Sequence, residues 1–200
     1  MAVRAVRALD PRLATLVERD GVPPLWERPP GFVTLGRIVL EQQVSLEAAA
    51  SLWQRLDREI PGGFEAEPIA ERGIDALRQH GLTRQKAAYL HGLAVVVADG
   101  SLQLSSLEQM SDQDASARLT GLHGIGPWTA AVYLLFALRR PDVWPPGDLA
   151  LHLAIQAMDG MATPPARLEA NHRAEQWAPW RAVAARILWH AYLRERGRKV

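Results

Sequence analysis

The chain has 200 residues, of which 48% are hydrophobic and 22% charged, so it can bury a core as one domain or as two small lobes. With 23 basic and 22 acidic residues its net charge is +1, so any contact with a polyanion must come from locally placed charge and backbone donors. It has no cysteine, which excludes disulfides, thiolate catalysis, thiolate zinc sites and cysteine-ligated iron–sulfur clusters.

The N-terminal part of the sequence predicts helices around a proline-rich loop. An amphipathic helix is expected first, best formed from Ala8 to Val17 with Asp10-Pro11 as its N-cap and first turn, and the prolines up to residue 30 then mark a loop. The apolar spacing from Phe32 to Leu56 predicts two helices. Between them lies a polar corner, Glu41-Gln42-Gln43-Val44-Ser45, in which Ser45 can cap the second helix.

The middle and the end of the chain predict further helices with clear stop signals. They are expected over residues 69–80, from Thr83 to Gly100, over 107–122, 128–138, 149–158, 169–177 and 181–194. All of the patterned segments are read as helices, so the sequence predicts an all-α protein.

A glycine-rich hairpin separates two of these helices. Gly121, Gly124 and Gly126 lie within six residues, and Pro127 opens the following helix. Such a turn leaves N–H groups unpaired around Gly124, Gly126 and Thr129, where the positive end of the helix dipole also lies. The pattern therefore favours a site for a phosphate, with a simple αα-hairpin turn as the alternative.

A second loop ends in a carboxylate at the head of a helix. The sequence Asp142-Val143-Trp144-Pro145-Pro146-Gly147-Asp148 precedes the apolar run that starts at Leu149. The prolines favour an extended entry, and Asp148 is placed to cap the helix with its side chain. Capping alone is the alternative to a chemical role for Asp148.

Four motifs, in this order, resemble the helix-hairpin-helix (HhH-GPD) DNA glycosylases, and within them the AlkA-like DNA-3-methyladenine glycosylase II branch. The resemblance extends from about Gly31 to Tyr192. The motifs are IVLEQQVSLEAA (38–49), GLTRQKAAYLHGLA (81–94), GIGPWTA (124–130) with the later P-G-D (146–148), and WAPWRAVAARILWH (177–190). The resemblance implies a two-lobed helical fold with the active cleft between the lobes, and base excision repair as the function.

The resemblance also implies roles for individual residues. Asp148 would be the catalytic carboxylate, stabilising an oxocarbenium-like sugar and positioning water. Trp128 and Trp189 would line a pocket for a cationic alkylated base, with Trp144 as a weaker candidate and core packing as the alternative for each. Val132 stands where the branch has a further aromatic residue, a departure that bears on the range of bases accepted.

DNA contacts are expected from the corner and from the hairpin. By the resemblance, Gln43 would enter the duplex at the place that the flipped nucleotide leaves, with Gln42 beside it. Exposed polar residues at a helix end are the alternative. His123, Gly124, Gly126 and Thr129 would contact the backbone of the DNA.

The resemblance also implies that the carbonyls of Thr120, Leu122 and Ile125 would hold a monovalent cation, Na⁺ or K⁺, and no other cofactor is expected. Lysine occurs only at residues 86 and 199, and Trp128 stands where bifunctional relatives carry a nucleophilic lysine. The six histidines form no metal-binding pattern, although His152 lies one helical turn after Asp148.

The sequence thus predicts a monofunctional, monomeric glycosylase that hydrolyses 3-methyladenine- or 7-methylguanine-type bases in double-stranded DNA. The alternatives are a non-catalytic DNA-binding module and a glycosylase of the same fold for another lesion. The expected division is an N-terminal segment (1–30), a lobe with the corner (31–105) and a lobe with the hairpin and Asp148 (106–200). With no membrane segment in sight, a cytoplasmic, nucleoid-associated or otherwise intracellular location is expected.

Overall fold

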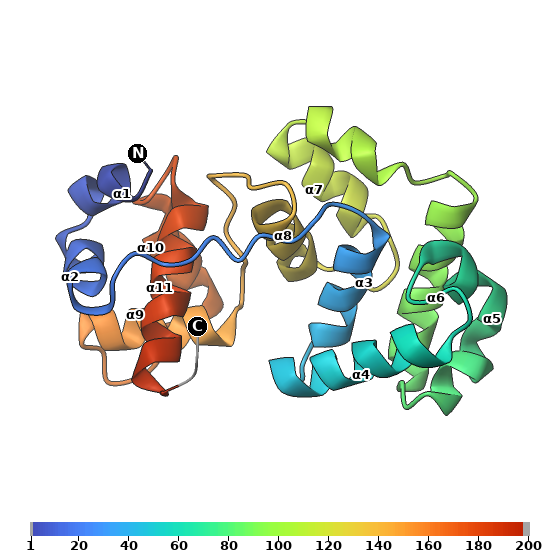
Figure 1. Cartoon of the computed structure of the whole chain (residues 1–200). Coiled ribbons are helices and arrows are strands. Elements are labelled where there is room, and N and C mark those ends of the chain that lie inside the picture. Colours follow the sequence, from blue (N-terminus) through green and yellow to red (C-terminus); the bar gives the residue numbers. More distant parts are fainter. Residues whose placement is uncertain (1, 198–200) are drawn as a thin grey trace. The chain divides into compact units, whose positions relative to one another are not determined.

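The protein is all-α, as its sequence predicts. A computed structural model describes residues 2–197, and that range contains helices but no strand (Figure 1). No helix within it combines the length and the apolarity needed to cross a bilayer. The elements are α1 (Ala2–Leu9), α2 (Pro11–Asp20), α3 (Phe32–Glu41), α4 (Leu46–Glu59), α5 (Ala66–Gln79), α6 (Arg84–Ala98), the 3₁₀ helix η1 (Leu104–Gln109), α7 (Asp112–Thr120), α8 (Pro127–Phe136), α9 (Leu149–Asp159), α10 (Arg167–Glu175) and α11 (Arg181–Glu195).

The chain forms two compact units, and their boundaries differ from the predicted ones. One unit is continuous and runs from Arg28 to Leu138. The other joins the two ends of the chain, Met1–Glu27 and Arg139–Val200. The boundary expected near residue 105 is therefore wrong, because the hairpin helices α7 and α8 belong with α3 to α6 and not with Asp148. We call the two units the hairpin unit and the terminal unit.

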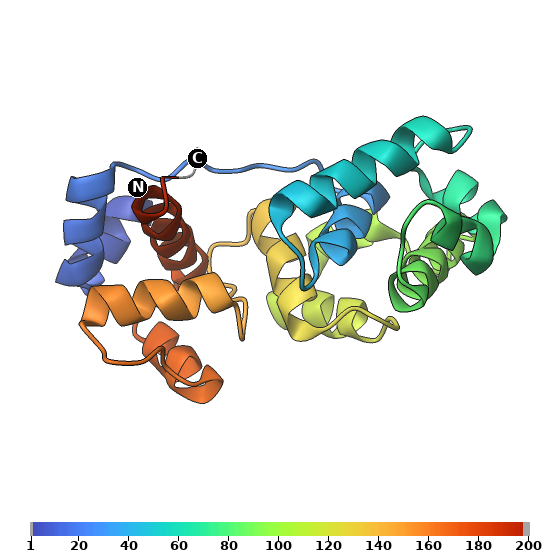
Figure 2. The same ribbon diagram turned by 90° about the horizontal axis from the view of Figure 1, so that it is seen from below.

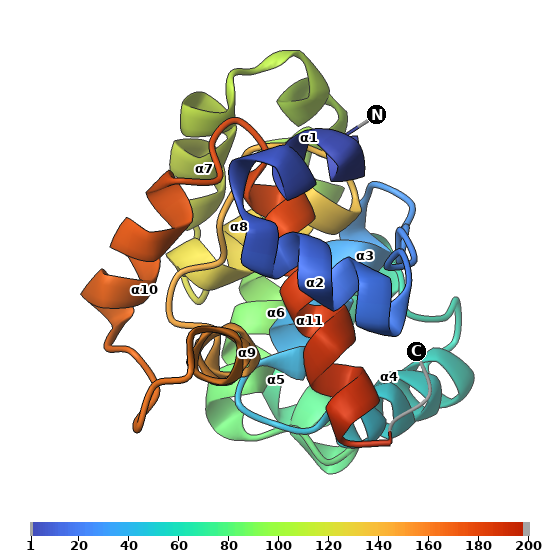
Figure 3. The ribbon, with the colours of Figure 1, turned by 90° about the vertical axis from the view of Figure 1, so that its left-hand side faces the viewer.

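Within the terminal unit, the buried carboxylate of Asp10 connects the N-terminal helices to the C-terminal part of the chain. Asp10 caps α2 by accepting the N–H of Arg12, and its other oxygen accepts from Trp177 Nε1 at 2.9 Å and from Arg173 at 2.6 Å. Burial raises the pKa of Asp10, but the hydrogen bonds from Trp177 and Arg173 outweigh this and lower it overall. This cluster links the start of the chain to its end, and α2 packs along α11 (Figure 3).

The hairpin unit is organised around α3 and α8. Both helices are largely buried, and α8 packs against α3 and α7. Tyr133 is fully buried, and its hydroxyl accepts the N–H of Gly31 at 3.0 Å, just before α3 begins. This packing explains the wrong boundary, because apolar periodicity identifies a buried face without saying which helix covers it.

Most predicted helix ends are correct to within a few residues. Ser45, Thr83 and Asp148 each cap their helix as predicted, accepting a backbone N–H from its first turn. Two regions differ. The N-terminal helix is two helices joined at Asp10, and the segment expected as one helix over 107–122 is a 3₁₀ turn followed by α7, which Ser111 caps. A side-chain cap inside an apolar pattern therefore marks a new helix in both cases.

Candidate functional site

Asp148 lies at the head of α9 in the terminal unit, with its side chain held from two sides. Its Oδ1 accepts the N–H of Leu151 at 3.0 Å and the indole Nε1–H of Trp189 at 3.1 Å. Gly147, with a φ of +79°, supplies the left-handed turn that brings the chain into the helix. Asp148 is half-buried, so the two donors fix the carboxylate in one orientation while it remains partly exposed.

Trp189 therefore touches the predicted catalytic carboxylate directly. It projects from α11 and is itself half-buried, which leaves part of its ring accessible next to Asp148. Trp144 has a different environment. Its ring packs on the buried Trp177 at 5.6 Å between centroids, and its Nε1 is buried with no hydrogen-bond partner in the described part of the chain. These contacts favour the packing interpretation for Trp144.

His152 lies one turn after Asp148 on α9. Its Nε2 is buried and has no hydrogen-bond partner among residues 2–197. Within residues 2–197 the side chains of His152 and Asp148 share no hydrogen bond, whereas Leu151 and Trp189 each donate one to Asp148.

The hairpin between α7 and α8 has the free donors that its glycines predict. Ile125 N–H closes the turn by donating to Leu122 O at 3.1 Å, and Gly126 O accepts from Ala130 N as α8 begins. Within residues 2–197, the N–H groups of Gly124 and Gly126 donate to no protein acceptor. They lie at the N-terminus of a ten-residue helix, where the dipole favours a negative charge.

Tyr89 of α6 fixes the shape of this hairpin. Gly124 has a φ of +86°, and a Cβ at this position would lie 2.5–2.6 Å from Cδ1 and Cδ2 of the Tyr89 ring, so the ring packs directly on the glycine backbone. The exposed His123 meets the same ring edge-on at 4.9 Å between centroids. The sequence does not predict this role for Tyr89. The only signal for it is that a tyrosine occurs in the GLTRQKAAYL motif, at a helix position where a smaller apolar residue would also satisfy the pattern.

The polar corner between α3 and α4 is a tight turn with Gln43 at its tip. Figure 2 shows the loop that joins α3 and α4. Gln43 is exposed and has a φ of +56°, which is unusual for a residue other than glycine. Gln42 points inward. Its Nε2 donates to Gly124 O at 2.9 Å and to Thr129 Oγ1 at 3.0 Å, so the corner is bonded to the hairpin.

Trp128 and Thr129, two further predicted residues, both lie in the hairpin unit. Trp128 starts α8 and is half-buried, and the side chain of Thr129 is almost fully buried against Gln42. The structure thus brings together Asp148 and Trp189 in the terminal unit. In the hairpin unit it brings together Gln42, Gly124 and Thr129. The role of each residue in catalysis or DNA binding stays a prediction.

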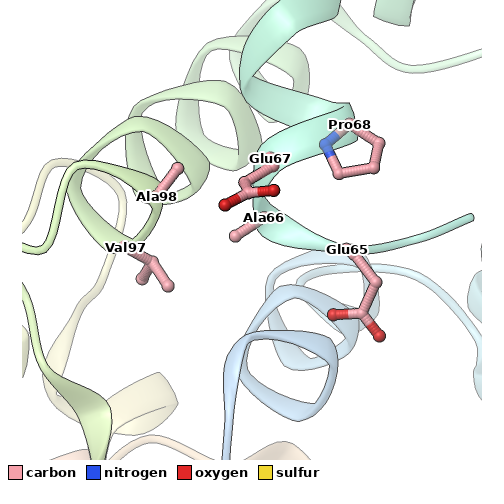
Figure 4. Close-up of a pocket in the computed structure, with 6 residues that line it drawn as sticks. All are labelled: Glu65, Ala66, Glu67, Pro68, Val97 and Ala98. Carbon is pink, nitrogen blue, oxygen red and sulfur yellow. The ribbon is translucent and has the colours of Figure 1, made fainter. Parts of the chain in front are cut away.

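A separate pocket of about 330 Å³ lies in the hairpin unit, where α5 begins and α6 ends. Figure 4 shows its six lining residues: Glu65, Ala66, Glu67, Pro68, Val97 and Ala98. None of the predicted site residues is among them. The charged groups that it presents are two carboxylates, which would repel a phosphate, so this pocket is not the candidate site.

Comparison with known proteins agrees with the arrangement of these motifs. A family model described as HhH-GPD superfamily base excision DNA repair protein matches residues 37–179. The chain is 31% identical over 162 residues to a putative DNA-3-methyladenine glycosylase (YfjP) of Bacillus subtilis, covering 78% of this chain and 56% of that one. It is 28% identical to DNA-3-methyladenine glycosylase 1 of Schizosaccharomyces pombe, covering 82% and 73%.

Among solved structures, the chain matches the Schizosaccharomyces pombe 3-methyladenine DNA glycosylase Mag1 in complex with abasic DNA. The TM-score is 0.85 with 26% sequence identity, and the match covers 94% of both chains. The chain spans only 56% and 54% of the lengths of two B. subtilis relatives. Because the family model covers well over half of the sequence, the chain belongs to the HhH-GPD superfamily of base excision DNA repair proteins.

Proposed function

We propose that this protein is a monofunctional DNA glycosylase that removes alkylated purines, such as 3-methyladenine and 7-methylguanine, from double-stranded DNA. The observation that carries the proposal is the geometry of Asp148. This carboxylate is partly exposed at the head of α9, and its orientation is fixed by Leu151 and by the indole of Trp189. A carboxylate that served only as a helix cap would not need an aromatic donor from another helix.

The reaction requires little beyond a well-placed negative charge. An alkylated purine is cationic, so the C1′–N bond breaks with its electron pair going to the base, which leaves as a neutral molecule. The carboxylate of Asp148 would stabilise the oxocarbenium-like sugar that forms and would orient the water that attacks C1′. The proton of that water passes to the carboxylate or to solvent, and an abasic site remains.

A cationic base is also favoured by electron-rich rings next to the carboxylate. The ring of Trp189 is adjacent to Asp148 and half-buried, so a base stacked on it would lie close to the negative charge. Trp128, which is half-buried at the start of α8, is proposed as a further ring on which a base can stack. Trp144 is the weakest of the three candidates, since its ring is already packed on Trp177.

The hairpin unit would make the contacts that bind the DNA. The free N–H groups of Gly124 and Gly126 at the start of α8 suit a backbone phosphate, and His123 is exposed beside them. Gln43, at the exposed tip of the corner, has the position needed to fill the gap left by a flipped nucleotide. We also propose that the protein acts as a monomer and inside the cell, where its DNA substrate lies.

A monovalent cation at the hairpin is a further part of the proposal. Leu122 O already accepts the N–H of Ile125, but a carbonyl oxygen has two lone pairs and can also ligate an ion. Together with the carbonyls of Thr120 and Ile125 it would hold Na⁺ or K⁺. The ion would add positive charge beside the phosphate that the hairpin binds.

We expect no lyase activity. Strand cleavage by bifunctional glycosylases needs a lysine that forms a Schiff base with the sugar, and Trp128 stands at that position on α8. Lys86, the lysine within the described residues, donates its Nζ to Leu40 O at 2.6 Å. Incubation with an abasic duplex and sodium borohydride should therefore trap no covalent complex. A trapped band at saturating abasic duplex would show instead that an amine of the protein forms a Schiff base with the sugar.

Replacement of Gln43 by glycine should weaken recognition of damaged DNA without destabilising the fold. A non-glycine residue in the left-handed region costs roughly 1 kcal/mol, and glycine removes that cost along with the side chain. We expect the affinity for an abasic duplex to fall about tenfold and the free energy of unfolding to change by less than about 1 kcal/mol. Fluorescence anisotropy and urea denaturation measure the two quantities. If the affinity for the abasic duplex does not change, Gln43 is only an exposed polar residue at a helix end.

The test of the proposed function is release of free base from duplex DNA treated with dimethyl sulfate. Chromatography should detect 3-methyladenine or 7-methylguanine, and duplexes that carry uracil or 8-oxoguanine should yield much less. Binding to an abasic duplex is measured in parallel. Binding without release from any substrate would favour a non-catalytic module, and release only from another lesion would keep the enzyme class and change the substrate.

A further inference from the structure

We propose that Gln42 and Lys86 are positioning residues that fix the position of the corner relative to the hairpin. Gln43 and the phosphate site would then contact the same DNA duplex at a fixed spacing. The inference rests on the proposed function, since it assumes that both segments meet DNA. It assigns to Gln42 and Lys86 a role inside the protein and leaves the DNA contact to Gln43.

Gln42 makes the direct link between the two segments. Its amide nitrogen has two donor hydrogens, and its two bonds are to Gly124 O in the hairpin and Thr129 Oγ1 in the first turn of α8. Gln42 is 82 residues from Gly124 along the chain. The next residue, Gln43, turns outward with its positive φ. The hairpin thus fixes the residue directly before the tip of the corner.

Lys86 fixes the same corner from the other side. Its Nζ donates to Leu40 O at 2.6 Å, in the last turn of α3, where carbonyl groups have no intrahelical donor. A positive charge at a helix C-terminus also interacts favourably with the helix dipole. The partial burial of Lys86 lowers its pKa. The lysine therefore holds the end of α3 just before Gln42 and Gln43.

The first turns of α6 contact both the corner and the hairpin. Lys86 and Tyr89 are three residues apart on this helix and share a face. Lys86 holds the corner, whereas Tyr89 packs on Gly124 in the hairpin. The start of α6 is thus a common support for both DNA-facing segments. Because one helix supports both segments, a phosphate bound at the hairpin would set the depth at which Gln43 meets the duplex.

The experiment compares binding of wild type and Gln42→Ala to two duplexes, one with a central abasic analogue and one undamaged. We expect Gln42→Ala to lower the affinity for the abasic duplex about tenfold and the affinity for the undamaged duplex less than about twofold. In the Gln43→Gly background, Gln42→Ala should have almost no further effect, because its effect acts through Gln43. Lys86→Met, which keeps the apolar stem, should follow the same pattern.

The matched control is Gln54→Ala, at an exposed position of α4 where glutamine makes no hydrogen bond to the described residues. It should leave both affinities unchanged. Urea denaturation of each variant supplies the folded fraction for correction. If Gln42→Ala lowers both affinities by the same factor, or if its effect adds in full to that of Gln43→Gly, the positioning role is overturned and Gln42 merely stabilises the unit.

The outcome separates this inference from the proposed function. If the wild type releases no base but prefers the abasic duplex, and the effects of Gln42→Ala and Gln43→Gly are not additive, the protein is a binding module. The positioning role of Gln42 then still holds. A wild type that releases base, with additive variants, would retain the glycosylase and reject the positioning role. A wild type without preference for the abasic duplex would overturn the inference.

Discussion

Asp148→Asn is expected to slow release of base from methylated duplex DNA by about a hundredfold to a thousandfold while leaving affinity for an abasic duplex almost unchanged. The asparagine has the same shape but no negative charge with which to stabilise the developing oxocarbenium ion. Loss of one such electrostatic contact lowers the rate by about a hundredfold to a thousandfold. Single-turnover release, measured with enzyme in excess, isolates the chemical step from product release.

The structure makes asparagine a well-matched substitution. Its carbonyl oxygen can accept the same two hydrogen bonds, from Leu151 N and Trp189 Nε1. Asparagine is also as good an N-cap as aspartate, so the free energy of unfolding should change by less than about 1 kcal/mol. Asp148→Ala serves as the contrast, since it loses both the charge and the cap and should cost about 1 kcal/mol of stability.

A different result would change the assignment. If Asp148→Asn releases base at the wild-type rate, Asp148 is a structural cap and the catalytic group must be sought elsewhere. If it loses activity together with stability, the loss of rate has to be corrected for unfolded enzyme. Only a rate loss with an intact fold supports a chemical role for the carboxylate.

The sequence predicts those parts of the fold that depend on residues close together along the chain. Asp148 was predicted as a cap because a carboxylate after a Pro-Gly pair and before an apolar run satisfies the first N–H groups of a helix within three residues. The free donors of the hairpin follow in the same way from closely spaced glycines and Pro127. Such features need no knowledge of tertiary packing.

The contacts that the sequence did not predict join distant segments. Asp10 is 167 residues from Trp177, and Gln42 is 82 residues from Gly124. Apolar spacing identifies which face of a helix is buried, but any other apolar face can cover it. The division into units was wrong for this reason. The inward direction of Gln42 was not foreseen either, because two adjacent glutamines at a helix end look equivalent in sequence.

Gly124→Ala is expected to have the largest effect on the hairpin, because it combines two separate penalties. The added Cβ would overlap the ring of Tyr89, with Cδ2 only 2.6 Å away, and the backbone φ of +86° disfavours any side chain. Overpacking costs about 1–3 kcal/mol and the left-handed backbone a further 1–2 kcal/mol or so. Urea denaturation should therefore show a loss of about 2–5 kcal/mol.

Gly126→Ala is the matched control, two residues further along the same hairpin. Its φ is −87°, and a Cβ there would meet no atom within 4 Å. Its free energy of unfolding should stay within about 1 kcal/mol of wild type. The double variant Gly124→Ala/Tyr89→Ala separates the two penalties at Gly124, since removal of the ring relieves the overlap but not the backbone strain.

DNA binding then shows whether the hairpin geometry, and not only its stability, is required. At a temperature at which Gly124→Ala is still folded, its affinity for an undamaged duplex should fall and its salt dependence should become shallower, because a displaced hairpin loses a phosphate contact. The opposite finding, full stability together with full affinity, would mean that Tyr89 moves aside at little cost. The tight packing of Tyr89 on Gly124 would then not be what shapes the phosphate site.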